Sequence, residues 1–126
     1  MIKSEIEACG NDPKRVFLGG FSQGTTLALE AGLTFEPKIG GIIIIGGFIS
    51  DLSKFEDLKE VPDTLILHGL QDKRVTWEHA EKTFKPILGK ENVKTTLLED
   101  MEHDLYSEEM KKIVHDFIRE RAPSEK

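Results

Sequence analysis

Four short apolar runs alternate along the chain with stretches in which apolar residues recur at helical spacing. Strands that alternate with helices in this way are typical of βαβ units and a parallel sheet. The run GGIIIIGG at residues 40–47 is apolar throughout, as expected for a central strand that is covered on both faces. The pattern therefore predicts an α/β fold with about four parallel strands and flanking helices, the strands lying at residues 15–19, 39–45, 64–68 and 93–98.

Three helices are expected between and after these strands. The first spans residues 23–31 and ends at Gly32 as its C-cap, and the second spans 76–85 with Thr76 as its N-cap. The last, at about 107–121, has apolar residues on one stripe, which predicts packing against the core. That stripe consists of Met110, Ile113, Val114, Phe117 and Ile118. Residues 48–62 show no clear periodicity and are expected to form a loop or a small lid.

Composition limits what the protein can contact. A chain of 126 residues fits one domain, and its net charge of -6 argues against a nucleic-acid partner, because phosphate binding needs clustered Lys and Arg. The longest purely apolar run, residues 42–45, is far shorter than the ~20 residues that span a bilayer, so no integral membrane segment is expected. The single cysteine, Cys9, suits a reducing compartment, and no signal peptide is visible. We therefore expect a cytoplasmic protein.

One serine lies in a pattern that is typical of a nucleophile. Residues 20–24 read Gly-Phe-Ser-Gln-Gly, which matches G-x-S-x-G. The match is weak alone, but here a predicted strand precedes it and a helix-forming stretch follows it, as a nucleophile elbow requires. Gly20 and Gly24 would remove side chains that clash in the sharp turn, so that Ser22 projects its hydroxyl. Ser22 is the candidate nucleophile.

A serine hydroxyl needs a base to take its proton and an acid to orient that base. In strand–turn–helix sites of this kind the chain order is serine, then acid, then histidine, each after a strand. The segment TLILHGLQDKRV predicts a strand that leads into a loop with Asp72, and VKTTLLEDMEH predicts one that leads to His103. Because such loops meet above the carboxyl ends of parallel strands, Asp72 and His103 are the candidate acid and base.

The other three histidines fit this position less well. His79 and His115 fall within helical patterns, which favours surface or packing roles. His68 ends a predicted strand, and we expect it to shape the Asp72 loop rather than to act as the base.

Two other carboxylates are weaker candidates for the acid. Asp100 and Asp104 are too close to His103 in sequence to come from a separate strand, which favours Asp72. An acidic cluster around His103 is typical of a solvated loop, and no paired metal-ligand spacing accompanies it, so no metal site is expected. The cluster comprises Glu99, Asp100, Glu102 and Asp104.

Three segments together resemble the C-terminal half of a known family. RVFLGGFSQGTTLALEAGL, LILHGLQDKRV and MEHDLYSEEMKKIVHDFI are similar, in order and spacing, to the acyl-protein thioesterase and phospholipase/carboxylesterase family of α/β-hydrolases. The resemblance implies hydrolysis of acyl thioesters on lipidated proteins, or of carboxylic esters including lysophospholipids, without a cofactor. It implies Ser22 as nucleophile, Asp72 as acid and His103 as base, with the Gln23 backbone N–H as an oxyanion donor. Phe48 aligns with a family stretch near the acyl site and is an expected substrate contact.

The resemblance also implies one truncated domain over residues 1–126. The family's earlier strands, with a His-Gly loop that supplies the second oxyanion N–H, would precede residue 1. The strand at 15–19 would then be an exposed apolar edge, which predicts a homodimer through that edge. The alternative function is a catalytically inactive α/β-hydrolase module that acts in binding or interaction.

Overall fold

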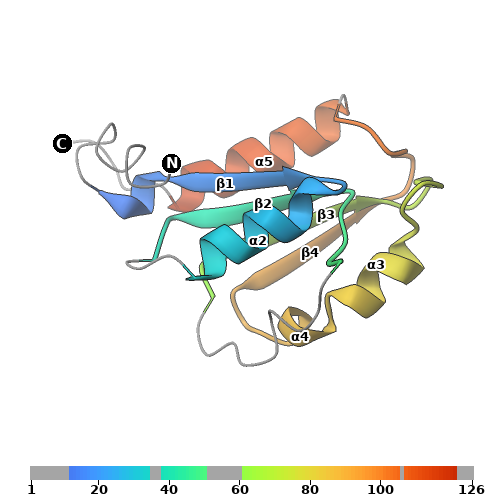
Figure 1. The fold of residues 1–126 in the computed structure, drawn as a ribbon. Coiled ribbons are helices and arrows are strands. Elements are labelled where there is room, and N and C mark those ends of the chain that lie inside the picture. The colour runs from blue at the N-terminus through green and yellow to red at the C-terminus, as the bar shows by residue number, and fades with distance from the viewer. Residues whose placement is uncertain (1–11, 35–37, 51–60, 106, 122–126) are drawn as a thin grey trace.

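The protein forms a parallel sheet with helices on both faces. The structure, a computed structural model, describes residues 12–34, 38–50, 61–105 and 107–121. Within these ranges four parallel strands follow one another in the order β1-β2-β3-β4. Because all four point the same way, their carboxyl ends meet at one edge of the sheet (Figure 1). The strands are β1 (Phe17–Phe21), β2 (Gly41–Ile45), β3 (Thr64–Gly69) and β4 (Val93–Leu98).

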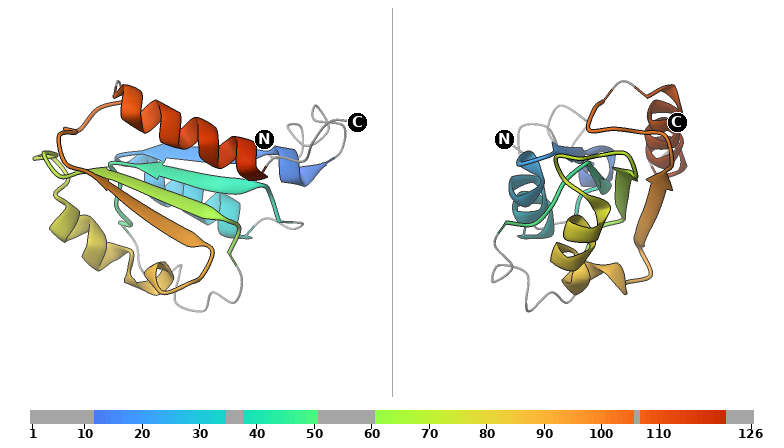
Figure 2. Two further views of the ribbon diagram at one scale, coloured as in Figure 1. Left: turned by 180° about the vertical axis from the view of Figure 1, so that it is seen from behind. Right: turned by 90° about the vertical axis from the view of Figure 1, so that its right-hand side faces the viewer.

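The helices divide between the two faces of the sheet. Helices α2 (Gly24–Thr34), α3 (Trp77–Thr83) and α4 (Lys85–Leu88) lie on one face, and α5 (Glu108–Arg121) lies on the other (Figure 2). A short 3-10 helix, η1 (Pro13–Arg15), precedes β1. The helices found in the described ranges are too short or too polar to cross a bilayer.

The alternation of side chains along the strands explains why β2 is apolar at every position. Ile42 and Ile44 belong to the core cluster under α2, α3 and α4, whereas Ile43 belongs to the cluster under α5. Strand β3 repeats this division with Ile66 on the first side and Leu67 on the second. Both strands are therefore buried on two faces, as the sequence pattern predicted for β2.

Helix α5 confirms the expected core stripe. Met110 and Phe117 are buried, and the other three stripe residues pack against the same cluster. The Phe117 ring meets the Phe17 ring edge-on, with 6.2 Å between their centroids. The Ser107 hydroxyl accepts a hydrogen bond from the Met110 N–H at 3.2 Å, which satisfies one of the free donors in the first turn.

Two predicted helix ends differ from those observed. Gly32 is not a C-cap but lies inside α2, where a Cβ would come within 2.6 Å of Ile42 Cδ1. This glycine lets helix and strand approach closely. The helix expected at 76–85 begins after Thr76, whose hydroxyl accepts the His79 N–H as predicted, but it breaks at Phe84 into α3 and α4. Pro86 explains the break, because its missing N–H and its ring oppose a continuous helix.

The first strand begins two positions later than expected, since Arg15 belongs to η1, and it continues to Phe21. The central part of the expected loop or lid, residues 51–60, lies outside the described residues, as does Cys9.

Candidate active site

Ser22 lies in a strained turn between β1 and α2. Its φ is 53°, in the left-handed region that residues with a Cβ rarely adopt, and no other described non-glycine residue has a positive φ. The Ser22 N–H donates to the Ile45 carbonyl at 3.3 Å, and its own carbonyl accepts from the Thr25 N–H at 3.2 Å. The serine is thus held between the end of β2 and the first turn of α2, as a nucleophile elbow would hold it.

The two glycines of the motif differ in their surroundings. A Cβ at Gly20 would lie 3.0 Å from the Ala28 Cβ and from backbone atoms of Gly24 and Thr25, so the strand and helix pack too closely there for a larger residue. A Cβ at Gly24 would meet no described atom within 4 Å. The steric reason expected for Gly24 therefore does not hold in the described part of the chain.

Asp72 is buried in the loop that follows β3. Its Oδ1 accepts the N–H groups of Arg74 at 3.0 Å and Val75 at 2.8 Å, and its own N–H donates to the Gly69 carbonyl at 3.1 Å. These bonds fold the loop around one carboxylate oxygen. The second oxygen, Oδ2, is left to face His103.

His103 lies in the loop that follows β4, and its Nδ1 is 2.6 Å from Asp72 Oδ2. A carboxylate accepts, so Nδ1 carries the hydrogen in this bond. The imidazole side chain is only 10% exposed and that of Asp72 is fully buried, which shields the pair from water. The structure therefore brings together the predicted acid and base from two different strand ends.

Two neighbours that the sequence pattern did not single out join this pair to the serine turn. The Phe21 ring, one residue before Ser22, lies against the His103 ring with 4.7 Å between centroids and 32° between planes. Gly46, with φ 55°, follows Ile45 at the end of β2. A Cβ on Gly46 would lie 3.3 Å from both Asp72 Oδ2 and His103 Nδ1. Ser22, Asp72 and His103 thus all lie at the carboxyl edge of the sheet, each just after a strand.

The remaining predicted contacts lie around this edge. Gln23 is exposed, and its backbone N–H makes no hydrogen bond to another described residue, which leaves it open to an acceptor. Phe48 is half-buried against the core, with its ring 5.8 Å from the ring of His79 on α3. The loop that holds Phe48 is tied to α2 where the Ser50 N–H donates to the Thr26 hydroxyl at 2.9 Å.

Most of the competing residues are exposed to solvent, unlike the Asp72–His103 pair. His79 and His115 are exposed, as are Glu99, Asp100 and Glu102, whereas Asp104 is half-buried. His68, by contrast, is fully buried, and its Nε2 is 3.8 Å from Asp72 Oδ2. Among the described residues, no cluster of three or more His, Cys, Asp or Glu side chains is arranged to hold a metal ion.

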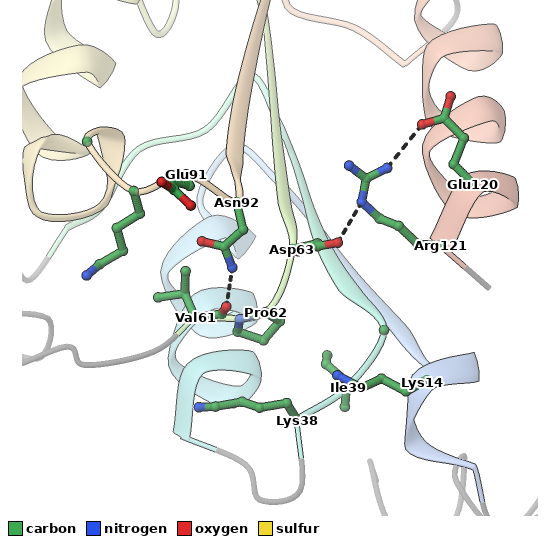
Figure 3. Close-up of a pocket in the computed structure, with 13 residues that line it drawn as sticks. Lys14, Lys38, Ile39, Val61, Pro62, Asp63, Glu91, Asn92, Glu120 and Arg121 are labelled. Atoms are coloured by element: carbon green, nitrogen blue, oxygen red, sulfur yellow. Dashed lines mark hydrogen bonds and ion pairs between the residues drawn. The ribbon is translucent and has the colours of Figure 1, made fainter. Parts of the chain in front are cut away.

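One hollow lies away from these residues. It has a volume of about 830 Å³ and is lined by residues that precede β2, β3 and β4, so it opens at the amino ends of the strands (Figure 3). Its walls are polar and internally paired: the Arg121 Nε donates to Asp63 Oδ2 at 3.0 Å, and the Asn92 amide donates to the Val61 carbonyl. It contains no part of the Ser22, Asp72 and His103 arrangement.

Comparison with known proteins agrees with this α/β fold. A family model described as phospholipase/carboxylesterase matches residues 1–121. Acyl-protein thioesterase 1 from Neurospora crassa is 34% identical over 98% of this chain and 52% of its own length, and its Gibberella zeae counterpart is 31% identical over 98% and 54%. A crystal structure of Arabidopsis thaliana SOBER1 superposes with a TM-score of 0.74 at 25% identity, covering 97% of this chain and 60% of the other.

The chain spans about half the length of the curated relatives it matches. The solved structures that resemble it include esterases and α/β-hydrolases, which agrees with a parallel sheet that has helices on both faces. The match to the family model covers nearly the whole chain. The chain therefore belongs to the phospholipase/carboxylesterase family of α/β-hydrolases.

Proposed function

We propose that this chain carries the catalytic residues of a serine hydrolase that cleaves acyl thioesters or carboxylic esters. The observation that supports it most is the 2.6 Å contact between His103 Nδ1 and Asp72 Oδ2, beside a serine held at φ 53°. A strained serine at a strand–helix turn and a buried acid–histidine pair are the parts that acyl transfer requires.

In the proposed reaction Ser22 Oγ attacks the carbonyl carbon of the substrate. Since Nδ1 of His103 is bonded to Asp72, Nε2 is the nitrogen that takes the serine proton. His103 then returns that proton to the leaving thiol or alcohol, and Ser22 is left as an acyl ester. Water, deprotonated by the same Nε2, then attacks this ester. The acyl–Oγ bond breaks, the carboxylic acid leaves, and His103 returns the proton to Ser22 Oγ.

The Gln23 N–H is proposed to donate to the oxyanion that forms during attack. It follows the nucleophile directly, as the first oxyanion donor of such sites does, and no described group accepts its hydrogen. Phe48 remains a proposed substrate contact. Acylated proteins or lipid esters are the proposed substrates, because the relatives named above are acyl-protein thioesterases.

Labelling with a fluorophosphonate probe tests this function directly. We expect the purified chain to form a covalent adduct, with mass spectrometry placing it on Ser22, and Ser22→Ala and His103→Ala to abolish it. Asp72→Asn should slow labelling by about 10⁴-fold, because an amide no longer fixes the imidazole tautomer. Circular dichroism of each variant checks that the fold is kept.

The alternative, an inactive module that binds without turnover, predicts a different result. A folded chain that never labels would favour that module and would contradict catalysis by this chain alone. Labelling that survives Ser22→Ala would place the chemistry at another residue. Comparison of matched thioester and oxygen-ester substrates then shows which bond is preferred.

Three further properties remain proposals. The chain is proposed to fold as one domain over residues 1–126 and to form a homodimer through the β1 edge of the sheet. It is also proposed to act in the cytoplasm, where its single cysteine would stay reduced. Cell fractionation checks the location, and an excess of the protein outside the cytoplasmic fraction would contradict it.

A further inference from the structure

His68 is a buried histidine that the proposed reaction does not use. It lies at the fifth position of β3, is fully buried, and packs against Trp77 with 5.5 Å between ring centroids. Its Nε2 is 2.6 Å from the carbonyl oxygen of Val75. A carbonyl can only accept, so Nε2 carries the hydrogen. Its Nδ1 is buried and has no hydrogen-bond partner among the described residues.

The bond from His68 closes the loop that holds Asp72. Val75 is fixed twice: its carbonyl accepts from His68, and its N–H donates to Asp72 Oδ1 at 2.8 Å. His68 therefore contacts one carboxylate oxygen indirectly, through a single residue. Its distance of 3.8 Å from Asp72 Oδ2 is too long for a hydrogen bond, so that oxygen stays committed to His103.

We propose that His68 is a positioning residue for Asp72. Its Nε2–H holds the Val75 carbonyl, which keeps the Val75 N–H on Oδ1 and so aims Oδ2 at His103. Small displacements of a catalytic group can lower the rate by large factors. The hydrogen bonds that join His68 to Asp72 through Val75 are therefore expected to affect the rate. The proposal rests on the serine hydrolase function above.

Two substitutions distinguish the hydrogen-bond donor of His68 from the size of its ring. His68→Gln places an amide N–H at the position of Nε2, because both nitrogens are three bonds from Cβ. His68→Phe keeps an aromatic ring against Trp77 but removes the donor. We expect His68→Phe to lower kcat for a p-nitrophenyl ester by about 10- to 100-fold with KM changed by less than about twofold, and His68→Gln to recover most of the loss.

A double-mutant cycle tests whether the effect passes through Asp72. Rates of fluorophosphonate labelling are measured for His68→Phe, Asp72→Ala and the double variant. The proposed effect of the His68–Val75 hydrogen bond passes only through the Asp72 carboxylate. His68→Phe should therefore slow labelling in the wild-type background and change the rate by less than about twofold in the Asp72→Ala background. Equal losses in the two backgrounds would overturn the proposal and leave His68 as a general core residue.

A readout that needs no catalysis keeps this test separate from the proposed function. The short Nδ1–H···Oδ2 bond should give a far-downfield proton NMR signal, assigned by its loss in His103→Ala. We expect His68→Phe to shift or broaden the signal and His68→Gln to retain it.

The outcomes for the two proposals can be told apart. If these NMR changes are seen in a chain that the probe never labels, the hydrolase function is refuted and the positioning role of His68 is supported. An unchanged signal in folded His68→Phe would overturn that role. If His68→Phe does not fold, loss of the signal in folded His68→Gln would overturn it as well.

Discussion

The backbone of Gly46 lies directly beside the proposed acid and base. Its φ of 55° is costly for a residue with a Cβ, and an added Cβ would lie 3.3 Å from Asp72 Oδ2 and His103 Nδ1. We expect Gly46→Ala to lower the free energy of unfolding by about 1–2 kcal/mol and to lower kcat/KM by about 10-fold or more, because the pair must move apart. Ester hydrolysis and urea denaturation measure both effects. Gly89→Ala is the control, since its φ is -86° and its Cβ would meet no described atom within 4 Å. A Gly46→Ala protein as active as Gly89→Ala would contradict the argument.

Among single residues, the sequence predicted the candidate site residues that a local motif or a strand end marks. It missed the residues that only the folded sheet brings next to them. The G-x-S-x-G pattern marked Ser22, and the order of strand ends marked Asp72 and His103. Gly46 and Phe21 carried no such mark. Their contacts with His103 arise because the ends of β1 and β2 pack against the loop after β4, and that arrangement is fixed by the sheet and not by neighbours in the chain.

The start of α3 is a capped helix end that can be tested alone. The Thr76 hydroxyl accepts the His79 N–H at 3.3 Å, and Thr76 adopts the extended backbone typical of an N-cap. Loss of an N-cap oxygen leaves a free donor and typically costs about 1 kcal/mol. Thr76→Ala should therefore lower the free energy of unfolding by about that amount, while Thr76→Ser keeps it. Equal stability of the alanine and serine variants in urea would show that the cap does not stabilise the fold.

Helix ends show which element boundaries the sequence could predict. Thr76 is a cap whose signal is local, and it was predicted correctly. Gly32 carried a misleading signal, since a glycine can end a helix or let it approach a strand, and only the contact with Ile42 distinguishes the two. The break before Lys85 had a local cause in Pro86.

The two edge strands of the described sheet differ in charge. Strand β1, FLGGF, contains no charged residue, and in the described chain only β2 pairs with it. Strand β4, VKTTLL, is the other edge and includes Lys94, a residue type that discourages pairing between chains. Leu27 on α2, the helix that packs against β1, is 71% exposed. The family resemblance predicted that this strand would be an edge, and the order β1-β2-β3-β4 places it at an edge of the described sheet.

We therefore expect self-association of this chain through the β1 edge and the neighbouring α2 surface, measured by size-exclusion chromatography with light scattering over a range of concentrations. A second copy pairing along β1 would satisfy its free backbone groups and cover Leu27. Leu27→Lys should shift the equilibrium toward monomer, because it places a charge in that interface. Leu97→Lys is the matched control: Leu97 is 40% exposed on β4, so the same change at the opposite edge should leave the dimer intact. A monomer at every concentration would refute the edge argument, and a dimer that only Leu97→Lys dissociates would move the interface to β4.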